Sequence, residues 1–180
     1  MEERKKLCLV SHCILNCNSK VEGSCKRKGP LKEVLYPLIE KDYGIIQLPC
    51  PEIDYGLRRW GHVREQFDNP FYREHCKRVL KPIMMQVMEY HNNNYTVNYV
   101  IGINGSPSCG VEFSYSSEKW GGELSKRDHL ESLKEGLHYK MFPGIFMEVL
   151  IALLHEYNIR TKFLGITESK LDEYDFMTLF

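Results

Sequence analysis

The sequence lacks an excess of charge of either sign, a long apolar run and an export signal. Lys plus Arg number 24 and Asp plus Glu number 24, so the formal net charge is zero. A balanced charge removes the electrostatic basis for a large nucleic-acid interface or a polybasic membrane surface. The apolar run at residues 7–10 is too short for a signal peptide, and no run approaches the roughly 18 residues of a membrane span. We therefore expect a soluble, cytoplasmic protein that does not enter a membrane.

The seven cysteines include no Cys-x-x-Cys pair. Zinc ribbons, thioredoxin-type redox motifs and the zinc base deaminases all use such a pair, so its absence argues against them. The odd number of cysteines and the expected reducing compartment argue against a disulfide framework. Any site that the cysteines share must therefore be assembled by the fold from distant positions.

Segments of strand character and helix character alternate along the chain. Strands are expected at residues 7–11, 44–48, 95–103 and 161–166, and helices at residues 30–39, 70–91 and 143–157. Residues 104–140 are rich in glycine, serine and charge, which is typical of loops with a small hairpin. The length of 180 residues suits one domain. The pattern predicts an α/β fold, in which a single domain over residues 1–180 has a Rossmann-like parallel sheet with helices on both faces.

Three cysteines follow the predicted strands closely. Cys13 and Cys50 lie two residues beyond the first and second strands, and Cys109 lies six residues beyond the third. Parallel strands end at one edge of a sheet, where open α/β folds bind their ligands, so we expect these side chains to converge. Cys8 falls within a strand and Cys76 on the apolar stripe of a helix, and both are expected in the core.

Converging thiolates leave three chemical alternatives open. Three cysteines can hold a zinc ion with one open position, or three irons of a cubane cluster with the fourth iron open. One of the cysteines could instead be a nucleophile without any metal. Soft thiolates suit both metals, but an all-cysteine set from three strand ends slightly favours the iron–sulfur cluster. His12 is expected to point away from the site, and Cys17 and Cys25 are expected to be incidental loop residues.

Three blocks of sequence surround these cysteines. They are Val10-Ser11-His12-Cys13-Ile14-Leu15-Asn16, then Cys50-Pro51-Glu52 with Gly56-Leu57 and Arg58-Arg59 nearby, then Ser106-Pro107-Ser108-Cys109-Gly110. In kind and order the blocks resemble the signature of the thiouracil desulfurase (TudS) family, and the resemblance spans residues 7 to about 115. Lys20-Val21-Glu22-Gly23 stands where many members have Arg-Tyr-Asp-Gly, and Arg58-Arg59-Trp60-Gly61 replaces a proline-rich run. The chain therefore resembles a divergent, single-domain member.

The resemblance implies a 4Fe–4S cluster held by Cys13, Cys50 and Cys109, with one open iron. It implies that this iron binds the sulfur of a thiolated pyrimidine, and that thiouracil or thiouridine is hydrolysed to uracil or uridine plus hydrogen sulfide without net redox change. Glu52 and Ser106 match the family's catalytic positions. Glu52 would act as a general base or proton shuttle, and Ser106 would hold the pyrimidine or relay a proton.

Other features bear on the substrate and on competing functions. Trp60 and Trp120 are candidates for stacking on a flat base. The basic runs at residues 26–28 and 58–59, with Arg64, are candidates for meeting a phosphate. The expected partner is a small thiolated pyrimidine or nucleoside; a tRNA substrate stays open without support from the net charge, and so does a homodimer. A non-enzymatic iron–sulfur or sulfide-carrier module and a zinc hydrolase that uses the same three thiolates are the alternative functions.

Overall fold

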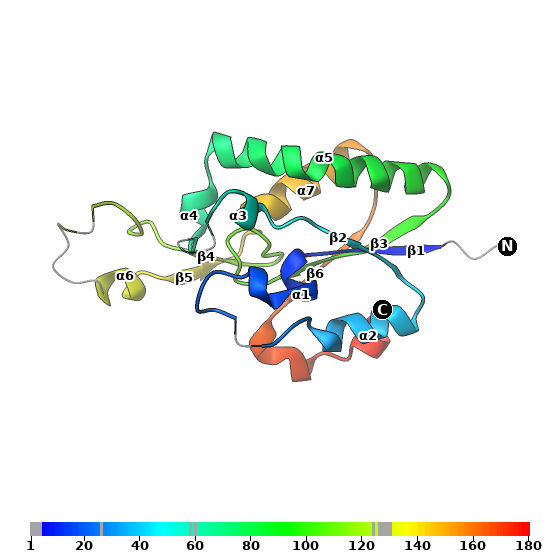
Figure 1. The fold of residues 1–180 in the computed structure, drawn as a ribbon, viewed down its shortest axis with the longest axis horizontal. Coiled ribbons are helices and arrows are strands. Elements are labelled where there is room, and N and C mark those ends of the chain that lie inside the picture. The colour runs from blue at the N-terminus through cyan, green and yellow to red at the C-terminus, as the bar shows by residue number, and fades with distance from the viewer. Residues whose placement is uncertain (1–4, 26, 58, 60, 124, 126–130) are drawn as a thin grey trace.

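A four-stranded parallel sheet runs through the centre of the molecule (Figure 1). Its strands are β1 (Lys6–Val10), β2 (Gly44–Gln47), β3 (Thr96–Ile103) and β6 (Lys162–Ile166), in the order β2-β1-β3-β6. The central strands β1 and β3 are buried along most of their length, which agrees with their predominantly apolar sequences. The computed structural model describes residues 5–25, 27–57, 59, 61–123, 125 and 131–180.

Helices cover both faces of the sheet. α5 (Pro70–Asn92) and α7 (Ile145–Glu156) pack together on one face, and α2 (Lys32–Glu40) and α8 (Phe176–Leu179) pack on the other (Figure 1). Successive residues of β1 alternate between two cores, because Leu9 packs on the α5 side and Cys8 packs on the α2 side. Cys76 on α5 is fully buried, as is Cys8, so both core predictions are confirmed. Among the residues described, no helix is long and apolar enough to span a membrane.

Short elements gather near the carboxyl ends of the parallel strands. They are α1 (His12–Leu15), a 3-10 turn at Cys17–Ser19, α3 (Pro51–Asp54), α4 (Arg64–Phe67) and a 3-10 segment at Glu168–Glu173. β4 (Ser114–Ser116) pairs antiparallel with β5 (His138–Lys140), and α6 (Glu131–Glu135) lies in the connection between them. The expected hairpin is therefore present. The short helices have too few residues for a periodic pattern, which is why the sequence did not predict them.

The strand order reverses between β1 and β3. The chain leaves β1 toward α2 and β2, on one side of β1, and leaves β3 toward α7 and β6, on the other side. Open α/β sheets bind ligands in the crevice at such a switch point, beyond the carboxyl ends of the strands. The segments that follow β1 and β3 carry Cys13 and Cys109, so both thiols lie where sheets of this kind bind their ligands.

Candidate functional site

A cavity of about 220 Å³ opens at the carboxyl edge of the sheet. All five site residues named from the sequence line it, namely Cys13, Cys50, Cys109, Glu52 and Ser106. The three cysteines, which we call the thiol wall, come from the segments that follow β1, β2 and β3. The cavity is smaller than the roughly 300–1,000 Å³ of pockets for drug-sized molecules, so it suits a small ligand.

Local backbone structure presents each cysteine of the thiol wall. Cys13 lies in the first turn of α1, and Cys50 directly precedes α3. Cys109 lies in a tight turn in which the Ser106 hydroxyl accepts a hydrogen bond from the Cys109 backbone N–H at 2.9 Å. Gly110 closes this turn, because a Cβ atom there would lie only 2.7 Å from the Ser106 carbonyl oxygen. The Ser-Pro-Ser-Cys-Gly block is thus a structural unit that points one thiol at the cavity.

The three thiols stay protonated in the absence of a counter-charge. Burial raises the pKa of each of them, and the charges of Cys13 and Cys50 raise the pKa of Cys109 further. Lys20 acts in the opposite direction on the pKa of Cys13 without cancelling the effect of burial. All three thiols line the same cavity. A positively charged group bound among them would favour the thiolate form of all three.

The surroundings of the thiol wall contain donors suited to thiolate sulfur. The Ser11 hydroxyl is fully buried and has no hydrogen-bond partner within the described ranges, and it lowers the pKa of the Cys109 thiol. The backbone N–H groups of Ile53 and Glu52, at the start of α3, lower the pKa of the Cys50 thiol against the larger effect of burial. Hydrogen bonds to ligand sulfurs are a normal feature of iron–sulfur sites, so the residues present fit such a cluster. No three His, Cys, Asp or Glu side chains of the described residues are grouped as for a single metal ion.

Glu52 is the carboxyl group next to the thiol wall. Burial raises its pKa to about 7, and a hydrogen bond with the Ser108 hydroxyl opposes this shift in part. Ser108 is fully buried and its hydroxyl lies 2.9 Å from the hydroxyl of Tyr72 on α5. Ser108 is not among the cavity-lining residues, so it holds Glu52 from the side of the protein interior. No sequence pattern indicated Tyr72, which lies in the packed face of a long helix.

A second side of the cavity is aromatic. His62, Tyr115 and Tyr139 line it, and we call these three residues the aromatic wall. The His62 and Tyr115 rings stack with their centroids 5.6 Å apart, and the Tyr115 and Tyr139 centroids lie 4.6 Å apart. The Tyr139 hydroxyl donates a hydrogen bond to the Tyr115 hydroxyl at 2.9 Å. Trp120 stacks on His62 at 4.9 Å but does not line the cavity, and Trp60 lies outside the described residues.

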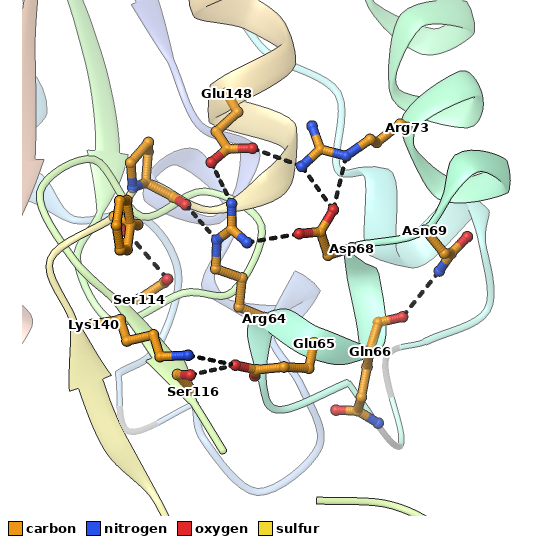
Figure 2. Close-up of polar contacts among 12 residues, drawn as sticks. Arg64, Glu65, Gln66, Asp68, Asn69, Arg73, Ser114, Ser116, Lys140 and Glu148 are labelled. Atoms are coloured by element: carbon orange, nitrogen blue, oxygen red, sulfur yellow. Dashed lines mark hydrogen bonds and ion pairs between the residues drawn. The ribbon is translucent and has the colours of Figure 1, made fainter. Parts of the chain in front are cut away.

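α4 ties the β4–β5 hairpin, which carries Tyr115 and Tyr139, to the body of the protein, and Figure 2 shows its contacts with Ser116 and Lys140. Glu65 accepts hydrogen bonds from the Ser116 hydroxyl and the Ser117 backbone N–H, and its carboxylate also pairs with Lys140. One side chain of α4 thus holds both β4 and β5. The neighbouring Arg64 pairs with Glu148 on α7 and donates to the Pro143 carbonyl oxygen at 3.1 Å. The hairpin is therefore connected to the α7 side of the core through side chains of α4.

The remaining cavity side combines the segment after α1 with the segment after β6. Lys20, whose side chain is 11% exposed, pairs there with Glu168. His12 also lines the cavity, with its Nδ1 accepting a hydrogen bond from Gln47, so the prediction that it points away is wrong. The alternation of side chains along a strand does not apply at His12, because the chain has already entered α1 there. Cys17 is buried in the core on the α2 side.

The basic runs named from the sequence are largely paired with carboxylates. Arg27 pairs with Glu33, Arg59 with Glu22, and Arg64 with Asp68 and Glu148. Residues 26 and 58 lie outside the described residues. The paired arginines offer no support for a phosphate site.

This chain resembles known proteins in sequence and in fold. No family model matches it. Over 108 residues it is 44% identical to the uncharacterized protein MJ0003 of Methanocaldococcus jannaschii, a match that covers 59% of this chain and 69% of that protein. Among solved structures, the 4Fe–4S-dependent thiouracil desulfidase TudS superposes with a TM-score of 0.50 over 95% of both chains, at 19% sequence identity. This likeness shows a common fold, and the α/β fold expected from the sequence is confirmed.

Proposed function

The chain belongs to the protein family of MJ0003 from Methanocaldococcus jannaschii, and we propose that it is a 4Fe–4S-dependent enzyme that removes sulfur from a thiolated pyrimidine. The reaction consumes thiouracil or thiouridine and one water, and it yields uracil or uridine and hydrogen sulfide without net oxidation or reduction. One observation carries the proposal: three thiols from three strand ends line one cavity with Glu52 and Ser106. The shared fold with a thiouracil desulfidase supports it.

We assign the thiol wall as the protein ligands of the cluster. Cys13, Cys50 and Cys109 would hold three irons of a bound cubane cluster, and the fourth iron would supply a Lewis acid for soft sulfur. The buried Ser11 hydroxyl, which has no hydrogen-bond partner among the described residues and lowers the pKa of the Cys109 thiol, would donate to a ligand sulfur. Such donors orient the ligands and stabilise their negative charge.

Glu52 is the side chain that exchanges a proton with water and substrate. Two described carboxyl groups line the cavity, and the other one, Glu168, is paired with Lys20. Glu52 is instead held by the neutral hydroxyl of Ser108, so no cation of the described residues competes for its proton-accepting oxygens. It takes a proton from the attacking water and returns one to the ring nitrogen or the departing sulfur.

Ser106 orients the pyrimidine. Its hydroxyl oxygen accepts hydrogen bonds from the backbone N–H groups of Cys109 at 2.9 Å and Ser108 at 3.3 Å. A hydroxyl group has two acceptor lone pairs and one donor, so the Ser106 proton is left to donate. We assign this donor to an oxygen or nitrogen of the ring, next to the carbon that loses sulfur.

We also propose that the protein works in the cytoplasm as a single domain. All seven cysteines are free thiols, and reduced thiols in this number fit a reducing compartment. The same compartment preserves an iron–sulfur site with an exposed iron.

Turnover of defined thiones tests the proposal. Protein purified without air is incubated with 2-thiouracil or 4-thiouracil, and both the loss of thione absorbance and the release of sulfide are followed. We expect repeated turnover, with sulfide and uracil formed in equal amounts. Release of at most one sulfide per chain would instead indicate a sulfide carrier, and activity of a colourless, zinc-loaded protein would indicate a zinc hydrolase.

A further inference from the structure

The aromatic wall lines the cavity but has no role in the proton transfers described above. We propose that it is the surface on which the planar ring of the substrate packs, and that it selects flat aromatic thiones over non-planar ones. This inference rests on the proposed function, because it assigns the recognition surface of the same cavity.

The rings of this wall are already packed against one another. The His62–Tyr115 and Tyr115–Tyr139 planes are inclined by 22° and 34°, with centroids 5.6 and 4.6 Å apart. These separations fall in the roughly 4.5–7 Å range of favourable aromatic pairs. Trp120 extends the row on the far side of His62. Phe113 packs against Tyr139 at the other end of the row, in an edge-to-face contact with the centroids 4.9 Å apart. A ligand ring that packs against the cavity side of the row loses little free energy in ordering it, because the row is ordered beforehand.

Backbone contacts connect the aromatic wall to the thiol-bearing turn. The Tyr115 backbone N–H donates to the Gly105 carbonyl oxygen at 3.0 Å, and Gly105 immediately precedes Ser106. Gly105 has a φ of +86°, and a Cβ atom there would lie 3.6 Å from the Tyr139 ring and 3.8 Å from the Tyr115 ring. The two tyrosines thus lie over the backbone that leads to Ser106 and Cys109. A ring packed on them is adjacent to the groups that act on its thione.

The wall offers apolar rings without charge near neutral pH. Burial lowers the pKa of His62, which keeps the imidazole neutral, and the hydrogen bond with Tyr115 raises the pKa of Tyr139 to about 12. Lys20, on another side of the cavity, is paired with Glu168. An uncharged heteroaromatic ring fits this lining, because it needs no counter-ion and it presents a flat face of its own.

Ligand planarity is the property to test. The probes are 2-thiouracil, which is flat, and 5,6-dihydro-2-thiouracil, which has the same thione and polar groups on a puckered ring. Binding to the holoprotein is measured by calorimetry, and kcat and KM are determined for each probe. The variants are Tyr115→Leu, Tyr115→Phe and, because Tyr139 is 55% exposed and its loss is tolerable for folding, Tyr139→Leu. Tyr36→Leu is the matched control, since Tyr36 is 55% exposed on α2 and does not line the cavity.

Loss of a tyrosine ring should weaken binding of the flat probe alone. We expect Tyr115→Leu and Tyr139→Leu to raise both the Kd and the KM for the flat probe by about tenfold, the scale of one base–aromatic stacking contact. Their kcat, their iron content and their affinity for the dihydro probe should stay close to wild type. Tyr115→Phe and Tyr36→Leu should retain the wild-type preference for the flat ring.

An unchanged ratio of the two Kd values in both leucine variants would overturn the inference, as would a wild-type protein that binds both probes equally or binds neither. Failure of the proposed function has a different signature. A wild-type protein that prefers the flat ring but releases no sulfide would refute the desulfidase and leave the aromatic wall as a binding surface.

Discussion

The thiol wall and the aromatic wall face the same cavity but are built in different ways. The thiol wall stands on the ends of β1, β2 and β3, and its turns are held by backbone hydrogen bonds to the central sheet. The aromatic wall stands on the segment before α4 and on a two-stranded hairpin that is held by side chains of α4 and by backbone hydrogen bonds to Gly105. The part of the site assigned to chemistry is thus anchored in the central sheet, and the part assigned to recognition is held at the edge of the fold. Changes on the two walls should therefore have separable effects.

The largest effect is expected from the thiol wall itself. Cys109→Ala leaves two cysteine ligands, so protein purified without air should lose the brown colour and nearly all of its iron. Cys76→Ala is the matched control, because Cys76 is buried in the core on α5. It should keep its iron and lose only about 0.5–3 kcal/mol of unfolding free energy. A Cys109→Ala protein with full iron content would disprove the ligand assignment.

Glu52→Gln should separate cofactor binding from turnover on the same side of the cavity. The amide keeps the shape and the contact with Ser108 but cannot carry the proton. We expect wild-type iron content and a fall in kcat of about 10²–10⁴-fold, the usual worth of a general acid–base group. Iron analysis and steady-state kinetics on one sample check both parts. A variant that turns over at the wild-type rate would remove Glu52 from the mechanism.

The tether of the aromatic wall should show a smaller and different effect. Glu65→Ala leaves the Ser116 hydroxyl and the Ser117 N–H without their acceptor, which costs about 1–3 kcal/mol of stability. The hairpin is then held less firmly, so the KM for the flat thione should rise while kcat and iron content are kept. Chemical denaturation and kinetics measure the two effects. If kcat falls and KM does not change, Glu65 does not act through the position of the aromatic wall.

The smallest effect is expected at Asp68, which links α4 to α5 at a distance from the cavity. Burial raises the pKa of Asp68, but hydrogen bonds from Arg73 and Arg64 outweigh it and hold the pKa below its usual range. A carboxylate with a lowered pKa stabilises the fold above its unfolded pKa of about 3.9, and this contribution is lost as the pH falls through the folded pKa. Asp68→Asn should lower Tm slightly at pH 7, because the pair is partly exposed to solvent. The difference in Tm between wild type and Asp68→Asn should shrink as the pH falls from 7 toward about 3. A difference that stays constant over this range would contradict the stabilising role of the Asp68 carboxylate.

The two walls also differ in how far the sequence predicted them. The sequence predicted that Cys13, Cys50 and Cys109 share a site, because apolar strands can be recognised and their carboxyl ends lie at one edge of the sheet. It did not predict the contact between Tyr115 and Tyr139, because these residues are 24 positions apart in a region without hydrophobic periodicity. Periodicity likewise missed the four-residue helices α1, α3 and α4, and with α1 it missed the place of His12 in the cavity lining. The role of Ser108 as the anchor of Glu52 was not predicted, because it depends on Tyr72, whose position only the packing of α5 determines.

The content of iron and acid-labile sulfide tests the central claim most directly, in wild-type protein prepared throughout without air. Three thiols that together hold a cubane cluster predict about four iron atoms and about four sulfide ions per chain, with broad absorption near roughly 400 nm. Protein from the same preparation that contains neither iron nor sulfide, or that carries one zinc ion per chain, would contradict the assignment of these thiols to a cluster.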